Sequence, residues 1–215
     1  IIMLDKYKDE QPILYNLLEN SIKKDKISHA YLFETNNNPN SLDIVYSFVK
    51  ELICPYDKKC DNCSICKRID DGNYLDVKVI NPDGLQIKKE QLLDLQDEFS
   101  KVSIENNKKV YIINECEKMN LQASNSILKF LEEPIDNIIA ILVTNNINKV
   151  LKTIISRCQV ISLNKSNNKI CDTSFENISY ILTNNSSDRE KFLSLDSNKE
   201  FMEDVLNFIS YYEDN

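Results

Sequence analysis

Apolar and polar positions follow two different periods along this chain. Short apolar or alternating runs, which are typical of strands, occur at residues 30–33, 74–80, 108–115, 137–146 and 159–163. The segments between them carry apolar residues at helical spacing. They predict helices over residues 8–25, 41–53, 87–100 and 118–133, with a short helical segment before residue 158. One helix followed by strands that alternate with helices predicts an α/β fold, with a parallel sheet covered by helices on both faces.

The pattern changes after the polar break at residues 164–169. Three acidic segments with helical spacing follow, and no strand is predicted among them. We therefore expect an α/β domain at residues 1–165 and a small all-helical domain at residues 166–215. The last 51 residues contain five Lys or Arg against ten Asp or Glu, so the helical domain is acidic.

Composition describes an ordinary soluble globular protein, with 42% hydrophobic and 28% charged residues among 215. The sequence has no apolar run of the ~20 residues that a membrane-spanning helix needs, and its start lacks the pattern of a signal peptide. We expect a cytoplasmic protein without membrane contact. The net charge of −8 argues against a protein that wraps nucleic acid by itself, because phosphate contacts need clustered Lys and Arg.

Four of the seven cysteines lie close together, in the pattern Cys54-x5-Cys60-x2-Cys63-x2-Cys66. Four thiolates at this spacing suit tetrahedral Zn²⁺, and four protein ligands leave no open position for water. The spacing therefore predicts a structural zinc module at about residues 54–66. A redox pair, an iron–sulfur cluster and chance spacing are the alternatives. The other cysteines are expected to be small buried apolar residues: Cys116, Cys158 and Cys171.

The first predicted strand is followed by the turn "TNNNPNS", residues 35–41, where nucleotide-binding α/β proteins hold phosphates. A phosphate loop needs glycines for close approach of the backbone, a lysine for the outer phosphates and a hydroxyl for Mg²⁺. This turn contains neither glycine nor lysine, and Pro39 removes one N–H donor. Because Asn tolerates a left-handed backbone, the turn can form without binding a phosphate. We expect no bound nucleotide.

The strand at residues 108–115 also departs from a nucleotide site, at the positions that hold Mg²⁺ and polarise water. Phosphoryl-transfer proteins hold Mg²⁺ at such a strand end with an aspartate and polarise water with a neighbouring acid. Here the two positions are Asn114 and Glu115. A neutral amide is a poor substitute for a carboxylate on a hard cation. Both departures predict a nucleotide-binding scaffold that has lost its nucleotide-binding residues, a degenerate P-loop protein.

Several motifs occur in an order that resembles a known family: "HAYLF", the four cysteines, "VYIINECEKMN", "SNSILKFLEEP", "ILVTNN" and "IISRCQVISL". Over residues 8–165 the chain resembles the delta-prime subunits of the bacterial DNA polymerase III clamp loader, in the AAA+ superfamily. The resemblance implies an AAA+ type parallel sheet with a zinc-binding insertion, and a helical lid domain at residues 166–215. Members of this family continue into a helical collar domain, which we expect to be absent from these 215 residues.

The resemblance also implies a role in DNA replication. Clamp loaders are five-subunit ATPases that open a sliding clamp and close it around primed DNA, and delta-prime subunits often lack nucleotide-binding residues. The implied partners are the gamma/tau and delta subunits, with the sliding clamp and primed DNA reached through the complex. No ATPase activity is implied for the chain by itself. Arg157, in the Ser156–Arg157–Cys158 motif, is implied to be an arginine finger for the ATP site of a neighbouring subunit.

Other interpretations stay open from the residues alone. One is an active AAA+ NTPase with an atypical phosphate loop, against which the missing glycines and lysine argue. Another is a zinc-dependent nucleic-acid-binding module, against which the acidic balance argues. For Arg157, composition alone favours a surface or ion-pairing arginine, whereas the flanking motif favours the finger. Five further polar residues are expected to be structural or solvated rather than catalytic: His29, Glu132, Glu133, Thr144 and Asn145.

Overall fold

The computed structural model describes residues 3–55, 60, 62–99 and 108–164, and the side chains of all of these except 96–99. The described chain alternates between helices and strands, as the sequence pattern predicts. In chain order, the elements are η1 (Met3–Tyr7), α1 (Pro12–Lys23), β1 (Ala30–Glu34), α2 (Ser41–Ile53), α3 (Ser64–Asp70), β2 (Val77–Ile80), α4 (Lys89–Phe99), β3 (Lys109–Ile113), η2 (Cys116–Lys118), α5 (Leu121–Glu132), β4 (Ile138–Thr144), η3 (Ile147–Lys149), α6 (Lys152–Ile155) and β5 (Gln159–Ser162).

The five strands form one parallel sheet in the order β2-β3-β4-β1-β5. Strand β1 lies between β4 and β5, and its Leu32 pairs in register with Leu142 of β4 and Val160 of β5. Between parallel strands the chain must cross over from the end of one strand to the edge where the next strand begins. All strands therefore begin at one edge of the sheet and end at the other.

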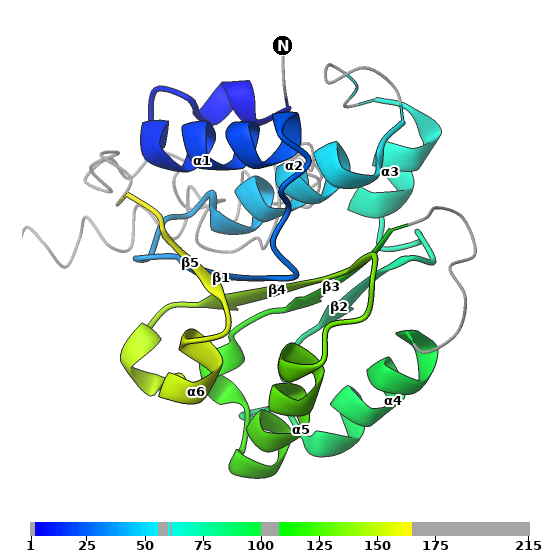
Figure 1. Ribbon diagram of the computed structural model, residues 1–215, viewed down its shortest axis with the longest axis vertical. Helices are drawn as coiled ribbons and strands as arrows, with labels where there is room; N and C mark the ends of the chain where they lie inside the picture. Colours follow the sequence, from blue (N-terminus) through cyan, green and yellow to red (C-terminus); the bar gives the residue numbers. More distant parts are fainter. Residues whose placement is uncertain (1–2, 56–59, 61, 100–107, 165–215) are drawn as a thin grey trace, which may run out of the picture. The chain divides into compact units, whose positions relative to one another are not determined.

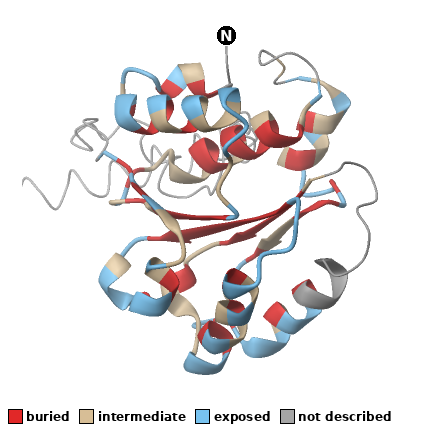
Figure 2. Ribbon diagram, in the orientation of Figure 1, coloured by how far each residue is buried: buried red, intermediate tan, exposed pale blue. Residues whose placement is uncertain are grey.

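Helices cover both faces of this sheet (Figure 1). Helices α1, α2 and α3 lie on one face, and α4, α5 and α6 lie on the other. Strands β1, β3 and β4 are consequently buried along almost their whole length (Figure 2). The predicted parallel α/β sheet with helices on both faces is confirmed.

Aromatic side chains fix the central helices to the sheet. Tyr31 of β1 packs edge-on against Phe48 of α2, with ring centroids 5.1 Å apart. On the opposite face, Tyr111 of β3 packs edge-on against Phe130 of α5 at 5.7 Å. The Asn120 side chain caps α5 by accepting a hydrogen bond from the N–H of Ala123 at 2.8 Å. Helix α5 thus has a defined start and a buried face.

The elements predicted for the α/β domain are all found, but three of them begin clearly later than predicted. Strand β2 begins at Val77 rather than at residue 74, and α5 begins at Leu121 rather than at residue 118, which belongs to η2. Helix α1 begins at Pro12 rather than near residue 8, because Pro is favoured in the first helical turn, where its missing N–H costs nothing. A separate 3-10 turn, η1, precedes it. The predicted boundary near residue 165, the helical domain 166–215 and Cys171 all lie outside the described residues.

Candidate functional site

The four clustered cysteines converge between the end of α2 and the start of α3. Cys54 directly follows α2, Cys63 is the N-cap of α3, and Cys66 lies in the first turn of α3. With Cys60, their sulfur atoms all lie within 4.8 Å of one another. The structure therefore brings together all four residues that the spacing singled out.

The spacing between the sulfur atoms fits a tetrahedral ion. Four thiolates at about 2.3 Å from a central Zn²⁺ lie about 3.8 Å from one another in a regular tetrahedron. The Sγ atoms of Cys54 and Cys63 are 3.8 Å apart. The N–H of Cys66 donates to the Sγ of Cys63 at 3.4 Å, which favours a charged sulfur at that position. This cluster can hold a metal ion with four sulfur ligands.

The pKa values of the thiols reflect their crowding. Burial alone raises the pKa of Cys63, but hydrogen bonds from the Cys66 N–H and from the neighbouring thiols lower it to about 7. Burial raises the pKa of the Cys66 thiol, and the adjacent Cys63 and Cys54 thiols raise it further. The pKa of Cys63 is thus lowered while that of Cys66 is raised, because the crowded thiols disfavour a second negative charge beside the first. A divalent cation at the centre favours the thiolate form of all four.

An ion pair fastens the cysteine cluster to the rest of the domain. The ammonium of Lys50, near the end of α2, lies 2.6 Å from the carboxylate of Asp70, at the end of α3. The Lys50 side chain is only 7% exposed, so its charge depends on protein partners rather than on water. Cys66 and Ile69 of α3 are buried as well. The sequence reasoning did not find this pair, because no local pattern links the two positions.

The turn between β1 and α2 has the backbone shape that its asparagines allow. Asn36 and Asn37 both adopt left-handed conformations, with φ of 49° and 59°. The N–H of Asn38 donates to the carbonyl of Thr35 at 2.8 Å and closes the turn. The expectation that the turn forms without glycine is confirmed.

Side chains of this turn contact other parts of the chain. The Asn36 amide donates to the carbonyl of Leu163 at 2.8 Å. The Asn38 amide, which is 2% exposed, donates to the Glu10 carboxylate at 2.9 Å and to the Asn164 carbonyl at 2.8 Å. The turn is therefore fastened to the segments before α1 and after β5.

Asn114 and Glu115 follow β3 at the same edge of the sheet as this turn. The Asn114 amide donates to the side-chain carbonyl of Asn81 at 3.1 Å. Glu115 has a left-handed backbone, with φ of 50°, and its carboxylate pairs with Lys118 at 2.5 Å. Both side chains thus interact with nearby polar groups of the same chain.

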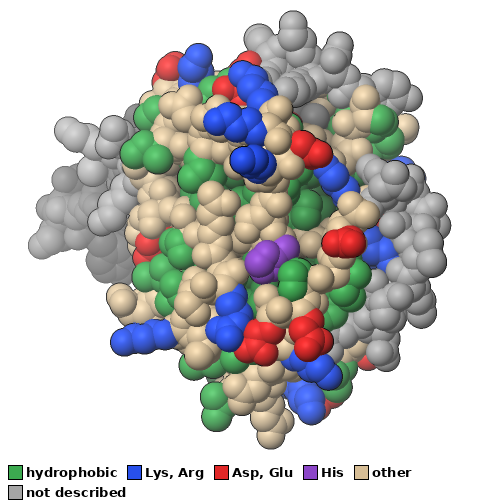
Figure 3. Space-filling view, in the orientation of Figure 1, with side chains coloured by type: hydrophobic (Ala, Val, Ile, Leu, Met, Phe, Trp, Pro, Cys, Tyr) green, Lys and Arg blue, Asp and Glu red, His purple; other side chains and the backbone are tan. Residues whose placement is uncertain are grey.

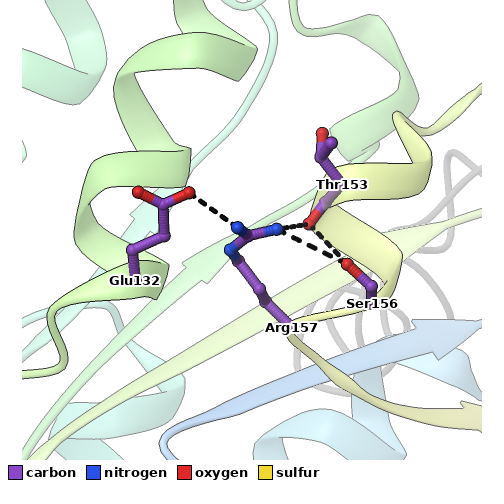
Figure 4. A network of polar contacts seen from close by, with 4 residues as sticks. All are labelled: Glu132, Thr153, Ser156 and Arg157. Carbon is purple, nitrogen blue, oxygen red and sulfur yellow. Dashed lines mark hydrogen bonds and ion pairs between the residues drawn. The ribbon is translucent and has the colours of Figure 1, made fainter.

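Arg157 lies on the surface immediately after α6, and its guanidinium takes part in a network of four residues (Figure 4). Its Nη2 lies 2.7 Å from a carboxylate oxygen of Glu132, the last residue of α5. Its Nη1 donates to the Thr153 carbonyl at 2.8 Å and to the Ser156 hydroxyl at 3.5 Å. The side chain is 33% exposed. Glu132 is exposed as expected, but the sequence reasoning missed its contact with Arg157.

Arg157 and the turn at residues 35–41 lie at opposite edges of the sheet. Arg157 precedes β5, at the edge where strands begin, and the turn follows β1, at the edge where strands end. The five residues of β1 separate these edges by about 16 Å. The guanidinium is therefore remote from the position where a phosphate would bind in this chain.

Comparisons with known proteins identify the family of this chain. A family model described as DNA polymerase III, delta subunit, matches residues 10–167. The DNA polymerase III subunit delta' of Bacillus subtilis (strain 168) is 40% identical over 211 residues, which make up 94% of this chain and 64% of that protein. The chain belongs to the DNA polymerase III delta-prime family. The family predicted from the motifs is therefore confirmed.

Related subunits and a solved structure extend the likeness of this delta-prime family member. The DNA polymerase III subunit tau of the same bacterium is 35% identical over 145 residues, 66% of this chain and 26% of that protein. The chain thus spans less than two thirds of the length of both relatives. The crystal structure of a DNA polymerase III gamma subunit-related protein from Thermotoga maritima has a TM-score of 0.56 at 21% identity, over 85% of this chain and 64% of that one. The fold is the predicted AAA+ type.

The remaining described cysteines and the polar residues expected to be structural lie in the core or at strand ends. Cys116 is buried, and Cys158 is half-buried against the same core. His29 is exposed at the start of β1, and its carbonyl accepts a hydrogen bond from the N–H of Ala140. Thr144 caps the end of β4 by accepting from the N–H of Asn146 at 3.1 Å.

The charges on the surface are mixed. The face shown in Figure 3 carries both Lys or Arg and Asp or Glu side chains among the described residues, and several of the Lys or Arg side chains lie close together in its upper part. Binding to nucleic acid phosphates requires clustered Lys and Arg, whereas the chain as a whole has a net charge of −8. In the described part of the chain, no helix combines the length and the apolar character that crossing a membrane requires.

Proposed function

We propose that the protein is a clamp-loader subunit of DNA polymerase III that does not hydrolyse ATP itself and supplies Arg157 to the ATP site of a neighbouring subunit. The observation that carries this proposal is the position of Arg157. Its guanidinium is at the surface, at the opposite edge of the sheet from the turn at residues 35–41. An arginine so placed is available to another subunit and not to this chain's own turn.

The contacts of the turn support the absence of ATP hydrolysis. A phosphate loop works because backbone N–H groups point at the anion and small glycines let it approach. Here the side chains of Asn36 and Asn38 are committed to the segments before α1 and after β5. Asn114 adds no charge for Mg²⁺. An active NTPase with an atypical loop is therefore the less favoured alternative.

The physical role of Arg157 follows from phosphoryl-transfer chemistry. Negative charge develops on the γ-phosphoryl oxygens in the transition state, and a guanidinium from outside stabilises it. The planar fork of Arg offers paired N–H donors that a lysine lacks. Such fingers contribute roughly 10³–10⁵ in rate. The neighbouring subunit would bind and orient ATP, and this chain would add one positive charge.

The cysteine cluster has a structural role in this proposal. We assign Cys54, Cys60, Cys63 and Cys66 as ligands of one Zn²⁺, which would neutralise their mutual repulsion and fix α3 against α2. Four thiolates fill a tetrahedral ion, so no position is left for a catalytic water. A nucleic-acid-binding zinc module is disfavoured by the net charge of −8.

The proposed partners are those of a clamp loader: gamma/tau and delta subunits directly, and the sliding clamp and primed DNA through the complex. We assign residues 1–165 to the AAA+ domain and residues 166–215 to a helical lid. The test is reconstitution. The full-length protein mixed with gamma/tau and delta subunits of the same organism should co-elute with them and restore loading of the clamp onto primed DNA. Loading at an equal rate without this protein would contradict the proposal.

A further inference from the structure

We propose that Glu132 is a positioning residue for Arg157: its carboxylate orients the guanidinium for entry into the neighbouring ATP site. This inference rests on the proposed function of Arg157. Glu132 would touch neither ATP nor Mg²⁺, and it would act only through the arginine. The Glu132–Arg157 pair would serve the neighbouring ATP site and not the turn at residues 35–41 of this chain.

The topology explains why two residues 25 positions apart meet. Glu132 ends α5 shortly before β4, and Arg157 follows α6 shortly before β5. Because parallel strands begin at one edge of the sheet, both side chains arrive at that edge from the same face (Figure 4). The carboxylate oxygen and Nη2 are 2.7 Å apart. The contact is therefore a consequence of the fold rather than of sequence proximity.

The carboxylate is presented from a well-anchored helix. Ile127 and Leu131 of α5 are buried in the core, and Ile154 of α6 is buried in the same cluster. Pro134 prevents continuation of α5 past this point, so Glu132 stands at a fixed helix end. A partner on a rigid element restricts a long side chain more effectively than one on a loop.

The network orients the guanidinium without using all of its donors. Arginine has five N–H groups. The contacts to Glu132, Thr153 and Ser156 engage one N–H of Nη2 and two of Nη1. The N–H of Nε and a second N–H of Nη2 have no partner within the described residues. These two donors remain for an incoming phosphate.

The solvent exposure of Glu132 and Arg157 limits the strength of their ion pair. Glu132 is 50% and Arg157 33% exposed, so water screens their attraction. A triphosphate carries more negative charge than one carboxylate, so it can attract the guanidinium away from Glu132 and towards the neighbouring ATP site. The pair therefore limits the conformations of the arginine before the reaction and does not retain it during the reaction. An exposed pair of this kind is expected to change the rate about two- to fivefold.

The experiment compares four variants of the full-length protein in the assembled loader, with ATP turnover as the readout. Glu132→Ala should lower kcat about two- to fivefold and leave KM for ATP unchanged, because the finger acts in the transition state. Glu133→Ala is the matched control, since Glu133 is an adjacent exposed carboxylate at the same helix end. It should turn over ATP like the wild type.

The double variant Glu132→Ala/Arg157→Ala distinguishes positioning from an independent effect. If Glu132 acts through Arg157, the double variant should be no slower than Arg157→Ala alone. An additive loss, a faster Glu132→Ala variant or a wild-type rate for it would overturn the positioning role. Arg157→Ala with unchanged turnover would instead overturn the proposed function. The two failures are therefore separable.

Discussion

Replacing Arg157 by Ala is expected to lower ATP turnover at the neighbouring site of the assembled loader by about 10³, the lower end of what a finger contributes. The loss should appear in kcat rather than in KM for ATP, because the guanidinium meets charge that develops only in the transition state. Arg157→Lys should recover only part of the rate, since an ammonium cannot replace the planar fork. Single-turnover hydrolysis by the reconstituted complex measures this effect.

Lys152→Ala is the matched control for the finger. Lys152 is an exposed cation in α6, one and a half turns before Arg157, so its removal changes surface charge near the same place. That variant should hydrolyse ATP at the wild-type rate, and both variants should co-elute with the other subunits. Equal rates for wild type and Arg157→Ala would remove the assignment of the finger.

Loss of the metal is expected to have the largest effect on stability. The full-length protein should contain one zinc per chain, and Cys66→Ser should contain none, because Cys66 is fully buried among the other sulfur atoms. Structural zinc in small modules contributes on the order of 10–16 kcal/mol, but the sheet here has a core of its own. A loss of a few kcal/mol, or a fall in Tm of about 10 °C, is therefore expected.

Elemental analysis and thermal unfolding of two variants test this expectation. Cys158→Ala removes a half-buried sulfur remote from the cluster and should retain one zinc per chain. Visible absorption distinguishes the alternative metal, since an iron–sulfur cluster is coloured and zinc thiolates are not. Full zinc content in Cys66→Ser, or iron in the wild type, would contradict the zinc assignment.

The sequence predicts most of the fold because each element has a strong hydrophobic period. Strand β4 is apolar from Ile138 to Val143, and α2 has the predicted bounds of 41–53. Pattern alone did not predict the separate turn η1, since five residues carry too little periodicity. The sheet order also lay beyond the pattern, because it depends on which strands pair across long crossovers.

The candidate site also contains features that the sequence predicts and contacts that it does not. The cysteines are close in sequence, so their spacing is sufficient to predict that their sulfur atoms converge. The contact of Glu132 with Arg157, and the ion pair of Lys50 with Asp70, join residues 20 or more positions apart. Those contacts arise only once the sheet has placed the helix ends together. Single-sequence reasoning therefore found the arginine but not its partner.

Photolabelling of the assembled loader with 8-azido-ATP tests most directly whether this chain serves a neighbour's ATP site and has none of its own. The account predicts label on the gamma/tau subunits and none on this chain, at ATP analogue concentrations that saturate turnover. Label on a peptide containing residues 35–41 of this chain, removed by competing ATP, would contradict it.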